Sequence, residues 1–172
     1  MRLRAALLGL LAGLPALAEP AAGGLLGRSV TFGAMTWKDG QRDRPLFVGE
    51  RHVAVVGPGA EYGLRPEGGQ NGWDIIPAII DITDDGVTVT YPADLLPGRF
   101  PEMGFNGYVL DFLVDCVLFA DVRVDEGSTT GSLRDVDAFV EEARLYIDVG
   151  GQKYGPATRF EVELEVMDCP LG

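Results

Sequence analysis

The stretch TRFEVELEVMD, residues 158–168, decides the fold of this chain. Apolar and charged side chains alternate along it, and alternation with a period of two is the pattern of a β-strand that is buried on one face only. We therefore expect a half-buried strand here. The apolar face holds Phe160, Val162, Leu164 and Val166, and the polar face holds Arg159, Glu161, Glu163 and Glu165.

Residues 115–125, DCVLFADVRVD, repeat this alternation. One phase is apolar throughout, which predicts a second strand with that phase toward the core. Cys116 belongs to this phase and is expected to point inward. The other members of the phase are Leu118, Ala120, Val122 and Val124.

The remaining chain consists of short apolar or alternating runs separated by turns rich in glycine, proline and aspartate. The turn Asp84-Asp85-Gly86 lies between two β-branched runs and predicts a hairpin. Helix is expected only within residues 135–144, for a turn or two. These features predict an all-β chain, an antiparallel β-sandwich of about eight strands, with a β-barrel as the alternative. Further strands are expected at residues 29–37, 52–56, 73–83, 87–91, 107–113 and 143–149.

The N-terminus has the features of a cleavable export signal. Arg2 and Arg4 supply positive charge, an apolar run follows, and Ala16-Leu17-Ala18 offers the small residues that a signal peptidase recognises. We expect residues 1–18 to be removed and residues 19–172 to form one domain in the periplasm or outside the cell.

No membrane span is expected after cleavage. The apolar run of the signal is shorter than the roughly 20 residues that cross a bilayer, and it is broken by Pro15. The best later run, residues 75–82, is interrupted by Asp81.

The chain is acidic, with 26 Asp and Glu against 14 Lys and Arg and a formal net charge of −12. Loss of Arg2 and Arg4 with the signal makes the remainder more negative still. Binding a nucleic acid requires basic groups that replace the counterions of its phosphates, so the charge argues against such a partner. It suits solubility, a bound cation or a basic partner.

Two cysteines, Cys116 and Cys169, would reach a compartment that permits disulfides. An even number of cysteines in an exported protein favours pairing, and we expect these two to form a disulfide. The loop so closed would stabilise the fold by about 4 kcal/mol in the chain-entropy estimate. No Cys-x-x-Cys motif points to redox chemistry instead.

Catalytic motifs are missing from the sequence. His52 is the single histidine and no GxSxG occurs, so a Ser-His-acid triad is not predicted. The glycines of GPGAEYG, residues 57–63, resemble a dinucleotide loop, but the residues that follow cannot form the helix that such a site needs. A small secreted hydrolase that uses paired carboxylates, with or without a metal, is the alternative to a non-catalytic protein.

Calcium is the cofactor that the acidic composition suggests, because oxygen-rich loops supply its ligands. The candidate ligands surround the loop that contains GSTTGS, and their spacing is not that of an EF-hand. They are Asp125, Glu126, Asp135 and Asp137.

Aromatic side chains near predicted strand ends form a second candidate site, because exposed Trp and Tyr bind sugar rings and protein partners. The alternative is that they close the ends of the core. The residues are Trp37, Trp73, Tyr62 and Tyr154.

Residues 104–166 contain two stretches that carry a resemblance to a known family. The first is Asn106-Gly107-Tyr108, and the second includes Ile147, Val149, Tyr154 and Pro156. They resemble the opening N-G-Y and the closing part of a pattern in exported bacterial β-domains, many of which carry a PEP-CTERM sorting tail. The resemblance implies an exported β-sandwich and, because no activity is established for such domains, no catalytic residue.

The sequence departs from that pattern in two respects. It ends in Cys169-Pro170-Leu171-Gly172, without a sorting motif, and Cys116 and Cys169 are additions to the pattern. We therefore expect an exported, non-catalytic binding or structural module whose partner is a protein or a glycan. A carbohydrate- or calcium-binding domain is the first alternative.

Overall fold

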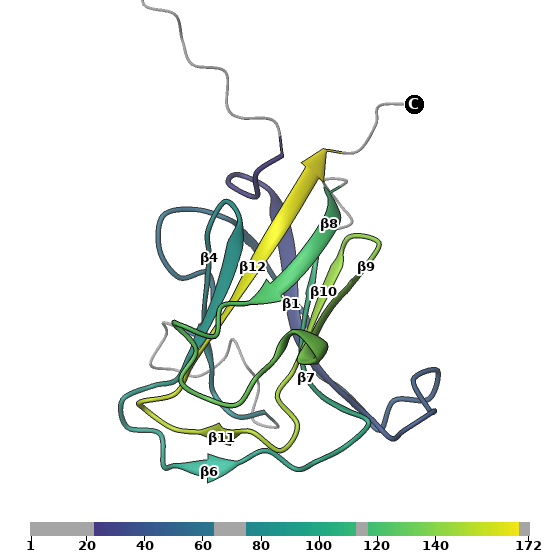
Figure 1. Ribbon diagram of the computed structural model, residues 1–172, viewed down its shortest axis with the longest axis vertical. Coiled ribbons are helices and arrows are strands. Elements are labelled where there is room, and N and C mark those ends of the chain that lie inside the picture. The colour runs from purple at the N-terminus through teal and green to yellow at the C-terminus, as the bar shows by residue number, and fades with distance from the viewer. Residues whose placement is uncertain (1–22, 64–74, 113–116, 169–172) are drawn as a thin grey trace, which may run out of the picture.

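The computed structural model describes residues 23–63, 75–112 and 117–168. These residues form two antiparallel sheets that pack face to face, which confirms the predicted all-β sandwich rather than a single closed sheet (Figure 1). Within the described ranges, no helix is long and apolar enough to cross a membrane.

The first sheet has the strand order β2-β1-β7-β10-β9, and β3 pairs with the earlier part of β1 beside β2. Its long central strands are β1 and β7, which pair over seven residues from Thr31↔Asp111 to Trp37↔Phe105. The strands are β1 (Ser29–Trp37), β2 (Phe47–Val48), β3 (His52–Val55), β7 (Phe105–Asp111), β9 (Ala138–Glu141) and β10 (Arg144–Asp148).

The second sheet has the order β4-β5-β12-β8. The alternating stretch near the end of the chain is its longest strand, β12, which lies between β5 and β8. Its burial alternates as predicted, with Phe160, Val162 and Leu164 buried. The expected hairpin at residues 84–86 joins β4 to β5. The strands are β4 (Ile79–Ile82), β5 (Gly86–Thr90), β8 (Val117–Val124) and β12 (Arg159–Asp168).

Two short strands, β6 (Gly98–Arg99) and β11 (Lys153–Tyr154), pair with each other at one end of the sandwich. The expected helix within residues 135–144 is reduced to a 3-10 turn at Asp135–Asp137. The rest of that segment is the hairpin of β9 and β10, in which Phe139 pairs with Tyr146. Helix is confined to that one turn because strand pairing outweighs a weak local helical pattern.

The single inward phase expected for residues 115–125 is also wrong. Ala120 has no partner in β12, and the register shifts between Glu165 and Val166, so β8 contains a bulge. One extra residue reverses the alternation, and Phe119 and Val122 therefore both pack against the core on either side of the bulge. Cys116 lies outside the described residues.

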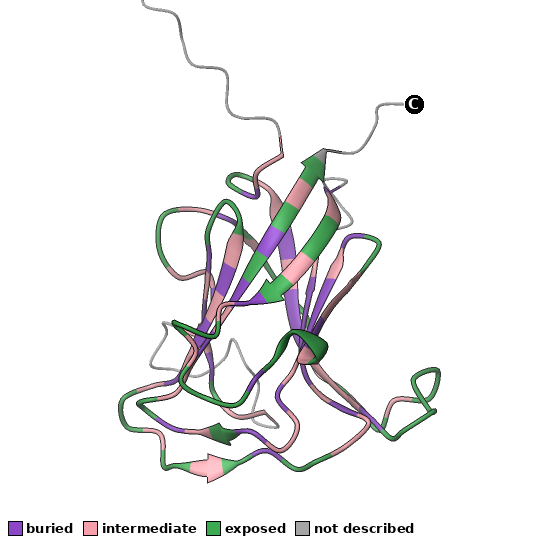
Figure 2. Ribbon diagram, viewed as in Figure 1, coloured by how far each residue is buried: buried purple, intermediate pink, exposed green. Residues whose placement is uncertain are grey.

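The core lies between the sheets and receives side chains from both. Buried residues accordingly recur along the strands of both sheets (Figure 2). Phe32 and Leu110 come from the first sheet, and Val89 and Phe160 from the second, and all four are fully buried. At one edge β8 lies beside β9. At the other, the chain after β3 crosses to the second sheet, where Tyr62 pairs with Ile80.

Candidate functional site

An apolar pocket of about 390 Å³ opens at the end of the sandwich where β1 finishes and β7 begins. Its wall combines the inner face of the first sheet with the connection between β6 and β7 and the segment that precedes β4. The lining residues are Ala34, Thr36, Phe47, Ile75, Ile76, Phe100, Pro101, Met103, Asn106, Gly107, Tyr108 and Val149.

The space opens where the core-facing residues of β1 are Ala34 and Thr36 rather than the large ring of Phe32. Val30 and Phe32 are buried in the core, whereas Ala34 and Thr36, next on the same face, are only partly buried. Because alternate residues of a strand face the same side, these four side chains lie in one row. The sheets are therefore filled at one end and hollow at the other.

Asn106 supplies the main polar group of the pocket. Its side-chain oxygen accepts a hydrogen bond from Thr36 Oγ1 at 3.2 Å, and its Nδ2 donates to the carbonyl of Pro101 at 2.9 Å. Its backbone N–H donates to Asp148 Oδ1 at 3.0 Å. Burial raises the pKa of the Asp148 carboxyl, against the opposing effect of this bond and of one from Gly150.

Tyr108 lies on the inner side of the pocket. Its ring packs edge-on against Phe100, with centroids 6.4 Å apart, and its hydroxyl is 3.2 Å from that of Tyr91. Burial raises the pKa of both phenols, so both are neutral hydrogen-bonding groups. A ligand in the pocket would meet an aromatic surface rather than a charge on this side.

Gly107 is required by the packing of the strands. A Cβ at this position would lie 1.9 Å from the carbonyl oxygen of Ile147 on β10. Asn106, Gly107 and Tyr108 are the residues that match the opening of the exported β-domain pattern, and all three line the pocket.

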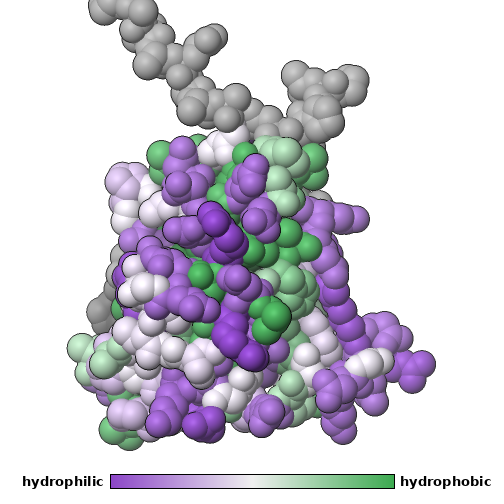
Figure 3. All heavy atoms as spheres, in the orientation of Figure 1, coloured by the Kyte–Doolittle hydropathy of each residue, from purple (hydrophilic) through white to green (hydrophobic). Residues whose placement is uncertain are grey.

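A larger polar hollow of about 570 Å³ crosses the outer face of the second sheet. Figure 3 views this face and shows hydrophilic side chains over most of its centre. The lining residues are Thr83, Asp85, Gly86, Val87, Thr88, Asp121, Arg123, Glu161, Val162, Glu163, Leu164 and Glu165.

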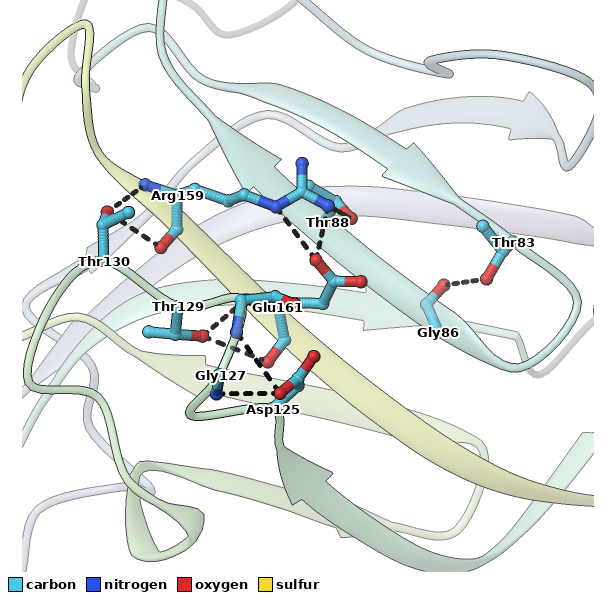
Figure 4. Close-up of polar contacts among 10 residues, drawn as sticks. Thr83, Gly86, Thr88, Asp125, Gly127, Thr129, Thr130, Arg159 and Glu161 are labelled. Carbon is cyan, nitrogen blue, oxygen red and sulfur yellow. Dashed lines mark hydrogen bonds and ion pairs between the residues drawn. The ribbon is translucent and has the colours of Figure 1, made fainter.

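The carboxylates of the polar hollow are ordinary surface charges. Glu161 is paired with Arg159, which also reaches Thr88 (Figure 4). Glu163 is paired with Arg123 at 3.3 Å. The other three carboxylates are exposed. The hypothesis of a carboxylate hydrolase requires a deep cleft in which acidic side chains converge, and this open face is not such a cleft.

The loop with the candidate calcium ligands is held by its own hydrogen bonds. Asp125 Oδ1 accepts from the N–H of Gly127 at 2.9 Å, and the Thr129 and Thr130 hydroxyls accept from backbone N–H groups of β12 (Figure 4). Interaction with Ser128 and Gly127 lowers the pKa of the Asp125 carboxyl.

Two of the other acidic candidates also accept hydrogen bonds from backbone N–H groups. Asp135 Oδ1 accepts from the N–H of Val124 at 2.8 Å, and Asp137 Oδ2 accepts from the N–H of Arg134 at 2.8 Å. Glu126 is exposed. In the part of the chain that is described, no three His, Cys, Asp or Glu side chains are placed to hold a metal ion, and calcium binding stays a prediction.

The three predicted aromatic candidates that lie within the described residues are apart from one another. Tyr62 is buried in the main core, where its hydroxyl donates to the carbonyls of Val30 and His52, both at 3.0 Å. Trp37 belongs to a separate cluster on the outer face of the first sheet. Tyr154 packs edge-on against Phe100, beside the pocket, with centroids 4.8 Å apart.

Three sequence candidates lie outside the described residues, namely Trp73, Cys116 and Cys169. His52 lies on β3, and its Nε2 is buried without a hydrogen-bond partner. The residue is half-buried on that strand.

Comparisons with protein-family models, with curated proteins and with solved structures give no match to this chain. The resemblance to exported β-domains therefore stays a prediction. The apolar pocket has the shape and chemistry of a ligand site, because it is concave, mainly apolar and carries few polar groups.

Proposed function

We propose that the protein is an exported, non-catalytic binding module that holds a small apolar ligand in the pocket between its sheets. The observation that carries the proposal is the apolar pocket of about 390 Å³, which falls within the range of about 300–1,000 Å³ typical of small-molecule sites.

The lining defines the ligand chemistry. An aliphatic or aromatic body would contact Ile75, Ile76, Met103 and Phe100, and removing apolar area from water contributes about 25 cal/mol per Å². One hydrogen-bonding group would reach the amide of Asn106 at the mouth. Because the chain carries a formal charge of −12, a neutral or cationic ligand fits better than an anion.

The test is binding of N-phenyl-1-naphthylamine, a neutral apolar probe that becomes fluorescent when it leaves water. We expect saturable binding to residues 19–172. Ala34→Phe should fill the pocket and weaken probe binding at least tenfold. Ala120→Phe adds the same ring at the exposed bulge of β8 and is the matched control.

Equal binding by both variants and the wild type would contradict the proposed site. Thermal unfolding of each variant shows whether the added ring is tolerated. If Ala34→Phe fails to fold, Thr36→Leu adds less bulk to the same wall and replaces it in the comparison. If no variant alters binding, a protein or glycan partner bound elsewhere is the better hypothesis.

Export is part of the proposal and has its own test. The charged start, the apolar run and Ala16-Leu17-Ala18 support cleavage after residue 18. Expression in a bacterium that exports by this route should yield a periplasmic or secreted product beginning at Glu19, as N-terminal sequencing would show. A full-length cytoplasmic product would contradict export and leave the pocket proposal standing.

A further inference from the structure

A second apolar cluster lies on the outer face of the first sheet, separate from the core. Trp37 and Phe105 are paired across β1 and β7, and Tyr146 lies opposite both Val109 and Phe139. The outer face of a sandwich sheet normally meets water. Trp37, Phe105, Val109 and Tyr146 are nevertheless at most 6% exposed.

The rings form two stacked pairs that meet at an edge. Trp37 and Phe105 stack with centroids 4.1 Å apart, and Phe139 and Tyr146 with centroids 4.8 Å apart. Trp37 meets Tyr146 edge-on at 6.2 Å. We call Trp37, Phe139 and Tyr146, with the carboxylate of Glu141, the aromatic cage.

The guanidinium of Arg42 occupies this cage. Its carbon lies 4.7 Å from the ring centre of Tyr146, 5.3 Å from that of Trp37 and 5.5 Å from that of Phe139. Both of its terminal nitrogens donate to Glu141, one to each carboxylate oxygen. Cation–π contact together with a two-pronged carboxylate is the recognition chemistry of a guanidinium.

Arg42 reaches the cage from the exposed loop between β1 and β2, which leaves the lower end of β1 in Figure 1. The loop has its own backbone bonds, from Gln41 N–H to the Lys38 carbonyl and from Arg44 N–H to the Gln41 carbonyl. Its shape therefore does not depend on the guanidinium alone. The Arg42 side chain is 40% exposed, so a ligand can approach the cage from solvent.

We propose that the aromatic cage is a binding site for the arginine side chain of a basic peptide partner, and that Arg42 is a built-in competitor that the partner displaces. The guanidinium seated in the cage shows the chemistry of the ligand. The charge of −12 favours a basic partner over an acidic one. This site is distinct from the apolar pocket and does not rest on the function proposed for that pocket.

The experiment uses two peptides whose termini are blocked and therefore uncharged, Ac-Gly-Arg-Gly-NH₂ and Ac-Gly-Lys-Gly-NH₂. Binding is followed by the NMR signal of the indole N–H of Trp37. Arg42→Ala opens the cage and should bind the arginine peptide at least tenfold more tightly than the wild type does. Arg44→Ala removes a neighbouring, exposed arginine of the same loop and should behave like the wild type. Lysine has no planar fork, so its peptide should bind Arg42→Ala several-fold more weakly.

Three results would overturn the proposal. They are no saturable shift in Arg42→Ala, equal affinity for the two peptides, or unchanged affinity when Glu141→Gln is added to Arg42→Ala. If Arg42→Ala does not fold, the wild type gives the answer through the Nε–H signal of Arg42 itself. The arginine peptide at high concentration should move that signal toward its value in a free side chain, and no movement would count against displacement.

Discussion

The hydroxyl oxygens of Tyr91 and Tyr108 lie 3.2 Å apart in the interior and join the two layers of the sandwich. Tyr91 directly follows β5 of the second sheet, and Tyr108 is in β7 of the first. Both rings are at most 4% exposed. Two phenols in an apolar core are tolerated because each hydroxyl satisfies the other.

Removing the second hydroxyl of this pair should therefore cost less than removing the first. Tyr108→Phe leaves the Tyr91 hydroxyl buried and unpaired, which should lower the free energy of unfolding by about 1–3 kcal/mol. Tyr91→Phe should do the same, and the double variant should lose less than the sum of the two. Urea unfolding of the four proteins measures the coupling, and additive losses would show that the hydroxyls do not depend on each other.

The fold was predictable because burial on one face imposes alternation, as along residues 158–168. The local pattern could not show that Phe139 and Val140 belong to a hairpin strand. Their pairing partners, Tyr146 and Leu145, lie on the next strand and decide the structure of this segment. The bulge at Ala120 could not be predicted for a similar reason. One unpaired residue leaves the alternation in the sequence intact, but it reverses which side chains of β8 point toward the core.

The candidate sites were less predictable than the fold. Tyr62 was a candidate ligand residue, yet it is buried, because its loop pairs with β4. The apolar pocket depends on the row of side chains along β1 and on where the sheets part, which no local motif encodes. The pocket was not among the sequence candidates, although three of its lining residues, Asn106, Gly107 and Tyr108, are those that match the opening of the exported β-domain pattern.

Glu142, in the turn between β9 and β10, has a φ of 53°, and in the described residues it is the only non-glycine residue with a positive φ. A side chain is disfavoured in this conformation, whereas glycine adopts it freely. Glu142→Gly should raise the free energy of unfolding by up to about 1 kcal/mol, after the greater entropy of glycine in the unfolded chain is subtracted. Glu126→Gly, in a turn without positive φ, should be neutral or destabilising. Thermal unfolding distinguishes the two, and a loss of stability in Glu142→Gly would show that the Glu142 side chain has a stabilising role.

Asp125 should contribute to the acid sensitivity of the fold. Hydrogen bonds from the Ser128 side chain and from the Gly127 N–H lower the pKa of its carboxyl in the folded state. A lowered pKa means that the ionised group stabilises the fold above its unfolded pKa of about 4, and that this stabilisation is lost as pH falls through the folded pKa.

Asp125→Asn keeps an acceptor oxygen but cannot titrate. The wild type should be more stable than Asp125→Asn at pH 6, and the difference should shrink steadily between pH 5 and pH 2.5. Glu126→Gln, one residue away, controls for the change in overall charge. Urea unfolding at each pH measures the difference, and a gap between wild type and Asp125→Asn that stays constant with pH would contradict the assigned hydrogen bonds.

Asn106 holds the mouth of the apolar pocket in place from two sides. Its Nδ2 ties the carbonyl of Pro101 and its Oδ1 accepts from Thr36, so Asn106→Ala removes both bonds and should destabilise the fold by about 1–2 kcal/mol. Thr36→Val removes only the second bond and leaves Oδ1 of a partly exposed residue open to water, so its cost should stay below about 1 kcal/mol. Urea unfolding ranks the two variants.

The same variants tested with the fluorescent probe separate an effect on structure from an effect on binding. Loss of the hydrogen bond to Pro101 should weaken probe binding in Asn106→Ala. Thr36→Val has a more apolar wall and should bind the probe at least as well as the wild type does. The reverse order of probe affinities would mean that the ligand depends on the Thr36 hydroxyl and not on the position of the segment that contains Pro101.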